Sequence, residues 1–249
     1  MGINNMKILI TGASGRLGKE LVRIYPDALT PSIQEMDITN PKSILNYISK
    51  QKLDIIIHLA ALTDIRKCEE NKNLAWKVNV LGTRDLLKTS LSLNKKCYFI
   101  YISTACVFDG NKGNYSESDL PYPKNFYSLT KFSGENVVQY YGNGFNWLII
   151  RTNFALREKW PYPKAFVDRW GTYLFADDLA KAIKQVIKQK LTGIVHVCGD
   201  KKLSMHELAK ITTPKIQPMT LVEYSGPPLT QNMTLISKRI SPFKLRRKV

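Results

Sequence analysis

The segment Thr11-Gly12-Ala13-Ser14-Gly15-Arg16-Leu17-Gly18 directly follows an apolar run at residues 7–11 and leads into an amphipathic stretch at residues 16–24. A glycine-rich turn between a buried strand and a helix lets the backbone approach a pyrophosphate. The helix N-terminus then offers free N–H groups and the positive end of its dipole. The lysine of an ATP-hydrolysing P-loop is missing, because Lys19 has the wrong spacing from the glycines. The segment therefore predicts a dinucleotide-binding fold.

Strand-like and helix-like patterns alternate through the first 150 residues. Apolar runs typical of strands buried on both faces of a parallel sheet occupy residues 7–11, 54–59, 97–103 and 147–151, with a further short strand expected at 28–30. Helical periodicity is found between them at residues 16–24, 41–50, 74–93 and 126–141. This alternation predicts an α/β fold, a Rossmann-type doubly wound parallel sheet.

The pattern is less regular beyond residue 151. We expect a helix at residues 177–189, a strand at 194–197, a helix at 204–212 begun by a Ser204/Glu207 capping box, and an irregular, proline-rich segment at 213–228. Residues 1–151 are expected to form an NAD(P)-binding Rossmann domain. Residues 152–249 would form a small C-terminal substrate-binding lobe, with residues 177–200 returning to the Rossmann sheet.

Composition limits the class of protein. The 249 residues are 44% hydrophobic and 23% charged, which is typical of a globular chain. The start of the chain has no secretory signal and no apolar run is long enough to span a membrane, so a cytoplasmic protein is expected. The four cysteines have no metal-ligand spacing, and no metal is expected. The net charge of +17 attracts polyanions in general, but no nucleic-acid-binding motif accompanies the basic run Lys238–Lys248. We therefore expect neither a nucleic-acid nor a membrane partner.

A tyrosine and a lysine at helical spacing indicate the chemistry. Tyr127 and Lys131 are at i and i+4 of the helix expected at 126–141, so their side chains share a face. A nearby cation lowers the pKa of a phenol and stabilises its phenolate. Ser103 and Thr104 end a buried strand at the carboxyl edge, where α/β sheets bind ligands, and a hydroxyl there could hydrogen-bond a carbonyl oxygen. The combination predicts a carbonyl reductase, in which an acid protonates the developing alkoxide.

These residues resemble the extended short-chain dehydrogenase/reductase superfamily, and within it most closely the dTDP-4-dehydrorhamnose reductases and related nucleotide-sugar 4-ketoreductases. The matching segments follow the order of that family across most of the chain. They are residues 11–18, 36–39, 58–64, 79–83, 101–110, 115–117, 127–131, 151–152 and 173–179.

The resemblance implies a role for individual residues. Thr104, Tyr127 and Lys131 would be catalytic, with Tyr127 as proton donor and Lys131 also bonding the nicotinamide ribose. Besides Tyr127 and Lys131, the cofactor would contact Gly12, Ser14, Gly15, Arg16, Leu17, Asp37, Ile38, Ala60, Ala61 and Thr63. The substrate would contact Thr104, Cys106, Asn153 and Phe154. Ile38, Ala60, Ala61 and Phe154 are equally consistent with plain packing.

The choice of cofactor depends on the end of the second strand, where an acid binds the ribose 2′-OH of NAD and an arginine binds the 2′-phosphate of NADP. Thr30-Pro31-Ser32 contains neither residue. Arg16 is the nearest basic candidate and no acid is evident beside it, so NADP(H) is favoured over NAD(H).

Two departures from the family leave alternatives open. The stretch between Arg151 and Asp177 is shorter than usual, so the sugar pocket is expected to be reduced. Ala105 replaces the usual aspartate, while Cys106 matches a cysteine that acts as acid and base in related epimerase/reductases. The alternatives to a 4-ketoreductase are a bifunctional 3,5-epimerase/4-reductase using Cys106 and a non-catalytic cofactor-binding regulatory subunit. By analogy, a nucleotide-sugar substrate and a homodimer paired through helices 74–93 and 126–141 are expected.

Overall fold

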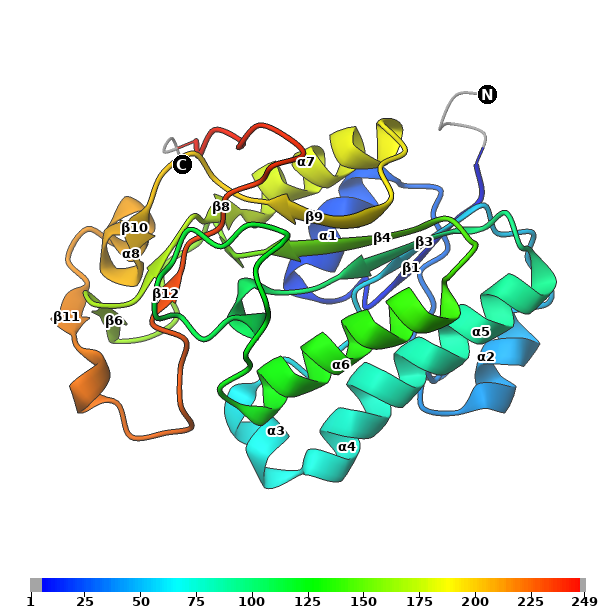
Figure 1. Ribbon diagram of the computed structural model, residues 1–249, viewed down its shortest axis with the longest axis horizontal. Coiled ribbons are helices and arrows are strands. Elements are labelled where there is room, and N and C mark those ends of the chain that lie inside the picture. Colours follow the sequence, from blue (N-terminus) through cyan, green and yellow to red (C-terminus); the bar gives the residue numbers. More distant parts are fainter. Residues whose placement is uncertain (1–5, 247–249) are drawn as a thin grey trace.

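The computed structural model of the chain describes residues 6–246. At its centre is a parallel sheet with helices on both faces (Figure 1). Its strands are hydrogen-bonded in the order β1-β2-β3-β4-β9, and each neighbouring pair is parallel. Their bounds are β1 (Ile8–Thr11), β2 (Ile55–His58), β3 (Tyr98–Ile102), β4 (Trp147–Thr152) and β9 (Gly193–Val197). The predicted doubly wound α/β fold is confirmed.

A further segment borders β1 on the side away from β2. Leu29 forms a parallel bridge with Leu9, and its N–H donates to the carbonyl of Ile8 at 2.8 Å. The short strand expected at residues 28–30 is reduced to this bridge. The chain therefore leaves β1 on one side and returns to it on the other, and this reversal of strand order marks the ligand-binding crevice of open α/β sheets.

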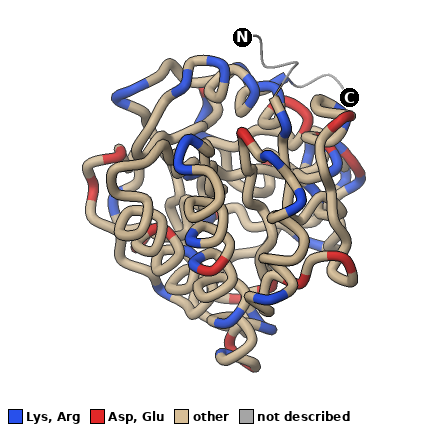
Figure 2. Tube along the Cα trace, turned by 90° about the vertical axis from the view of Figure 1, so that its right-hand side faces the viewer, with Lys and Arg blue, Asp and Glu red and all other residues tan. Residues whose placement is uncertain are grey.

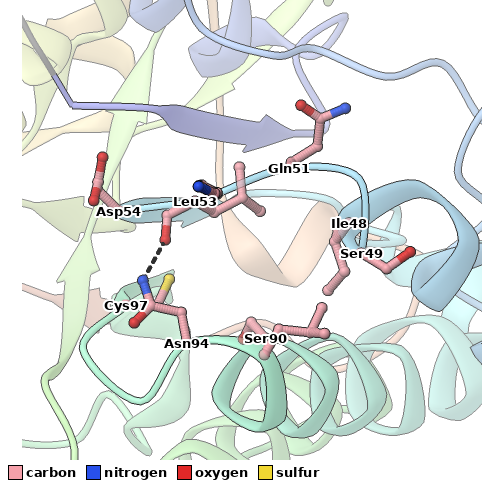
Figure 3. Close-up of a pocket in the computed structure, with 10 residues that line it drawn as sticks. Ile48, Ser49, Gln51, Leu53, Asp54, Ser90, Asn94 and Cys97 are labelled. Atoms are coloured by element: carbon pink, nitrogen blue, oxygen red, sulfur yellow. Dashed lines mark hydrogen bonds between the residues drawn. The ribbon is translucent and has the colours of Figure 1, made fainter.

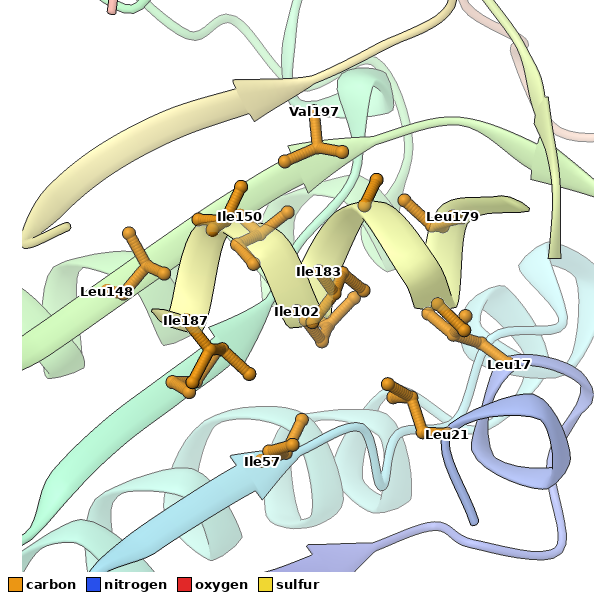
Figure 4. Packing of buried hydrophobic residues seen from close by; sticks show 14 of the residues in the cluster. Leu17, Leu21, Ile57, Ile102, Leu148, Ile150, Leu179, Ile183, Ile187 and Val197 are labelled. Carbon is orange, nitrogen blue, oxygen red and sulfur yellow. The ribbon is translucent and has the colours of Figure 1, made fainter. Parts of the chain in front are cut away.

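Alternate residues along the strands face opposite helix layers. Helices α1 (Arg16–Ile24) and α7 (Ala176–Lys188) cover one face, where Leu17 and Leu21 pack with Leu179, Ile183 and Ile187 (Figure 4). The other face is covered by α2 (Pro41–Ile48), α5 (Thr83–Leu93) and α6 (Phe126–Tyr141). The period of two in a strand produces this division, because successive side chains point to opposite faces.

The helix expected at residues 74–93 is present, but six of its residues are π-helical. The chain forms α3 (Ile65–Glu70), α4 (Lys72–Trp76), a π-helical turn at Lys77–Gly82 and then α5. Asn79, within the π turn, exchanges hydrogen bonds with the backbone of Leu62, which lies 17 residues earlier. Hydrophobic periodicity could not predict the π-helical turn, because the turn accompanies a contact with Leu62, which lies outside the helix.

The smaller lobe packs at the carboxyl edge of the sheet, where Cys106 and Phe108 share a buried cluster with Leu203 and Met233. It contains short strands and helix α8 (Met205–Thr212), for which the predicted Ser204/Glu207 capping box is confirmed. The segment expected to be irregular, 213–228, contains a strand and a 3₁₀ turn. The remaining short elements are β5 (Phe154–Ala155), β6 (Lys164–Phe166), β7 (Trp170–Gly171), β8 (Leu174–Phe175), β10 (Leu203–Ser204), β11 (Gln217–Met219), β12 (Asn232–Met233) and the 3₁₀ turns Ala105–Val107 and Leu221–Glu223.

Residues 177–200 contribute most of α7 and all of β9 to the large unit: α7 packs on α1, and β9 pairs with β4. The first residues, 1–5, on which the expectation about a secretory signal depends, lie outside the described part of the chain, as do Arg247 and Lys248 of the basic run. Between residues 6 and 246 no helix is long and apolar enough to cross a membrane.

Lys and Arg lie on several sides of the molecule, with Asp and Glu among them (Figure 2). Within the described part of the basic run, Arg239 donates from Nη1 to the carbonyls of Thr192 and Ile194, at 2.5 and 2.8 Å. Arg246 lies 3.6 Å from the carboxylate of Asp178. This segment therefore makes contacts within the chain itself.

A buried ion pair joins α6 to the sheet. Glu135 and Arg151 are 0% and 2% exposed, and Arg151 Nη2 lies 2.7 Å from Glu135 Oε2. The Nε atom of Arg151 donates to Oε1 at 3.0 Å, and the hydroxyl of Ser103 donates to the same oxygen at 2.5 Å. The carboxylate thus holds the helix to the ends of both β3 and β4.

Glu135→Gln should lower the free energy of unfolding by about 3–5 kcal/mol, because it leaves a guanidinium charge uncompensated in the core. The double variant E135L/R151M should recover most of this loss. Urea unfolding measures both effects. The control is Glu20→Gln, whose partner Arg23 is 73% exposed, and it should change stability by less than about 1 kcal/mol. Equal effects at the two pairs would contradict the expectation.

Candidate active site

The turns after β1 and β2 meet at the carboxyl edge, where the strand order reverses. Gly12 has a φ of 69°, and a Cβ on it would lie 2.7 Å from the backbone nitrogen of Ala60. A Cβ on Gly18 would lie 2.3 Å from the carbonyl oxygen of Gly12. Glycine is needed at both positions for the turn to close against its neighbours.

The N-terminus of α1 faces this crevice, and its first backbone N–H groups have no side-chain cap. The helix begins after Gly15, has no side-chain cap and has no acidic residue in its first turn. Its first N–H groups and the positive end of its dipole therefore suit a phosphate. Ser14 and Arg16 are exposed beside it, whereas Leu17 is buried in the core and can face a ligand only through its backbone. The residues present fit the pyrophosphate of a dinucleotide.

The other residues predicted to meet the cofactor lie on two further segments. Ala60 and Ala61 are half-buried and Thr63 is exposed, all on the segment that follows β2. The carboxylate of Asp37 accepts hydrogen bonds from the backbone and hydroxyl of Thr39, both at 2.8 Å. Ile38 packs closely against Gly82.

His58 links these turns to the helix layer. Its Nδ1 lies 2.7 Å from the hydroxyl of Thr11, and its Nε2 lies 3.0 Å from the hydroxyl of Thr83. Because Thr83 donates its proton to the carbonyl of Asn79, Nε2 must carry the ring proton and Nδ1 must accept from Thr11. Burial, with a smaller effect from the charge of Lys131, lowers the pKa of His58 to about 3. Both ring nitrogens of His58 are thus hydrogen-bonded inside the protein.

Asn79 is a connecting residue to which sequence reasoning assigned no role, although it begins one of the matching segments, 79–83. Its amide nitrogen donates to the carbonyl of Leu62 and to the hydroxyl of Thr130, both at 2.9 Å. Thr130 in turn donates to the carbonyl of Tyr127. The π turn is thereby tied to the helix that carries the candidate catalytic residues.

Thr104 and Tyr127 are neighbours in the structure. A hydrogen bond from the Thr104 side chain lowers the pKa of Tyr127, but loss of water around the phenol is the larger effect and raises that pKa, as does the neighbouring Cys106. The pKa of Tyr127 is therefore raised overall, although Lys131 follows it at i+4, because burial is the largest effect. A phenol with a raised pKa keeps its proton at neutral pH and is available as a donor.

Lys131 is 4% exposed, and its Nζ lies 4.0 Å from the centre of the Tyr101 ring. Burial lowers the pKa of Lys131 to about 7, and the carboxylate of Glu135 opposes this effect. Lys131 therefore loses its charge near neutral pH, while cation–π attraction and Glu135 favour the ammonium form.

Cys106 lies beside a buried guanidinium. Arg169 is 8% exposed, and its Nη2 lies 3.9 Å from the Cys106 sulfur and 3.3 Å from the sulfur of Met233. Its Nε donates to the carbonyl of Thr230. No histidine takes part in these contacts.

The two remaining predicted substrate residues make contacts within the chain. Asn153 is buried, and its amide donates to the carbonyl of Met233 at 2.8 Å. Phe154 is half-buried in β5 and packs against the cluster between the sheet and α7. Neither contact distinguishes a substrate residue from a packing residue.

A cavity of about 480 Å³ lies at the opposite edge of the sheet, before β2. Leu53, Ser90 and Asn94 are among its lining residues, and Asn94 donates from its side chain to the carbonyl of Leu53 (Figure 3). None of the predicted site residues lines it. In residues 6–246 no group of three or more His, Cys, Asp or Glu side chains is arranged to hold a metal ion.

Comparison with known proteins agrees with this geometry. The family described as the RmlD substrate binding domain matches residues 6–170. A dTDP-4-dehydrorhamnose reductase of Aggregatibacter actinomycetemcomitans is 28% identical over 231 residues, which cover 82% of this chain and 76% of that protein. Methionine adenosyltransferase 2 subunit beta of Rattus norvegicus is 24% identical over 241 residues, covering 84% and 72%.

The fold has a solved counterpart. The crystal structure of dTDP-4-dehydrorhamnose reductase from Bacillus anthracis str. Ames in complex with NADP superposes with a TM-score of 0.85 and 26% identity. The match covers 93% of this chain and 90% of that one.

Lys131→Met should be more stable than the wild type at pH 6. The pKa of Lys131 is about 7 in the folded chain and about 10.4 when unfolded, so between these values the unfolded chain binds more protons and wild-type stability rises with pH. The advantage of K131M should therefore shrink as the pH rises from about 7 to 10. Urea unfolding at pH 6, 8 and 10 measures it. Lys188→Met, at an exposed position of α7, is the control, and a pH-independent effect of K131M would contradict the assignment.

Proposed function

Because the chain belongs to the RmlD substrate binding domain family, we propose that it is a dTDP-4-dehydrorhamnose reductase-like enzyme. It would use NADPH to reduce the 4-keto group of a nucleotide-linked 6-deoxysugar. Thr104, whose side chain lowers the pKa of Tyr127, and Lys131, one helical turn after Tyr127 on α6, carry the proposal. The named relatives and the NADP complex of the Bacillus anthracis enzyme support the choice of substrate class and cofactor.

The chemistry of the proposed step divides between cofactor and chain. When bound, a reduced nicotinamide supplies a hydride to the ketone carbon. Tyr127 donates its phenolic proton to the ketone oxygen, which becomes a hydroxyl, and retains the electron pair as a phenolate. The hydroxyl of Thr104 hydrogen-bonds the same oxygen while charge develops on it. Lys131, in its ammonium form, stabilises the phenolate until solvent returns a proton.

The partners proposed for this chain are a nucleotide sugar and a second copy of the chain. Leu74 and Trp76 of α4 and Leu129 of α6 are 44%, 38% and 40% exposed. These apolar side chains lie on or beside the two helices expected to pair in a homodimer. Light scattering of the purified chain would determine its oligomeric state.

The proximity of Arg169 to Cys106 keeps a second candidate function open, a bifunctional 3,5-epimerase/4-reductase. A cysteine thiolate at this position could remove the proton beside the ketone. Such a reaction in D₂O would place deuterium on the carbon next to the ketone, and Cys106→Ser would abolish the exchange. A non-catalytic regulatory subunit would instead bind NADPH, reduce no ketosugar and capture a stoichiometric partner enzyme.

Tyr127→Phe should lower kcat by about 10²- to 10⁴-fold, the usual contribution of a general acid, and leave NADPH binding unchanged. The assay follows the loss of reduced-cofactor absorbance with a panel of nucleotide 4-ketosugars. Tyr122→Phe is the matched control, because Tyr122 precedes the same helix and is 69% exposed. Full turnover by the Y127F variant would remove Tyr127 from the mechanism.

A further inference from the structure

A carboxylate accepts hydrogen bonds just after the short segment at residues 28–30, which borders β1. The backbone N–H and the hydroxyl of Ser32 both donate to Oε2 of Glu35, at 2.8 and 2.9 Å. The intervening turn closes through the N–H of Met36, which donates to the carbonyl of Ser32 at 2.9 Å. Because this turn brings Glu35 back onto Ser32, the earlier expectation that no acid lies at the strand end is wrong.

A parallel bridge relates the segment before Ser32 to β1. Leu9 and Leu29 are bridge partners on neighbouring parallel segments. Counting three residues along each segment leads to Gly12 and to Ser32, so Ser32 follows its segment at the level where the glycine-rich turn begins. In dinucleotide-binding sheets the end of this second segment meets the adenosine ribose, where an acid binds a 2′-OH and a cation binds a 2′-phosphate.

The charge of Glu35 is retained at neutral pH. The two hydrogen bonds from Ser32 lower the pKa of this exposed carboxyl group, and no lysine or arginine is among the causes of the shift. Arg16 is exposed in the first turn of α1, which follows the glycine-rich turn. An exposed anion thus follows the segment beside β1, and an exposed cation follows the glycine-rich turn.

We propose that Glu35 is a specificity-determining residue that limits the preference of this chain for NADP(H) over NAD(H). Its carboxylate occupies two donors that a 2′-phosphate would use and repels that phosphate. A ribose 2′-hydroxyl can instead donate to it. Arg16 acts in the opposite direction by attracting the 2′-phosphate. The inference rests on the proposed function, because it concerns the cofactor of the same site.

The hydrogen bonds alone do not distinguish Glu35 from an ordinary capping residue. In the lobe, Glu223 accepts from the backbone of Thr220 at 2.6 Å and from its hydroxyl at 3.2 Å, in the same arrangement. Glu223 is exposed and its pKa is lowered by bonds of the same kind. Glu35 differs from Glu223 in that it follows the segment bordering β1, and Glu223 is therefore the matched control.

The experiment measures dissociation constants for NADPH and NADH by fluorescence titration, and for 2′,5′-ADP and 5′-AMP by calorimetry. Glu35→Gln keeps a hydrogen-bond acceptor for Ser32 and removes the charge. It should raise the ratio Kd(NADH)/Kd(NADPH) by up to about tenfold, because the repulsion between the carboxylate and the 2′-phosphate is lost. Glu223→Gln should leave the ratio unchanged, and Arg16→Gln should lower it. Glu35→Ala, also at an exposed position, is a second variant without the charge.

Thermal unfolding verifies that each variant is folded. A rise in the ratio for both Glu35 variants, with none for E223Q, supports the proposal. An unchanged ratio in E35Q and E35A overturns it while leaving the proposed reductase function intact. If the wild-type chain binds neither NADPH nor NADH, the proposed function and this inference fail together.

Discussion

The Glu135–Arg151 ion pair holds the helix of the candidate active site to the sheet. Both side chains are buried, and Ser103, the residue before Thr104, donates to the same carboxylate. Lys131 lies one helical turn before Glu135. An unpaired charge here would be strongly destabilising, so α6 can neither slide nor rotate away from the ends of β3 and β4. The spacing between the phenol, the ammonium group and the Thr104 hydroxyl depends on this constraint.

A second set of polar contacts lies beneath the crevice. His58 bonds Thr11 and Thr83, while Asn79 bonds Leu62 and Thr130, so the turns of the predicted cofactor site are connected to α5 and α6. Buried polar groups must find partners inside the protein, and each of these contacts satisfies that requirement. The network leaves the outer rim, where Arg16 and Glu35 are exposed, free to interact with a ligand.

Most of the fold and part of the candidate site could be predicted, because their signals are local. The glycine spacing, the apolar runs and the Ser204/Glu207 box each depend on residues close together in the sequence. The π turn could not be predicted, because Asn79 bonds Leu62 from another segment. The raised pKa of Tyr127 was missed for a similar reason: the i, i+4 spacing brings a cation near, but burial depends on the whole packed structure.

Local patterns in the sequence are sufficient to predict the parallel α/β sheet, the glycine-rich turn at its edge and the helix that carries Tyr127 and Lys131. These follow from hydrophobic periodicity and from the conformational range of glycine, which act over a few residues. The tertiary structure alone decided that Glu135 would pair with Arg151, that Lys131 would be buried and that Glu35 would fold back onto Ser32. Charge and proton affinity depend on solvent exclusion and on the neighbours brought together by folding, and no local pattern records either.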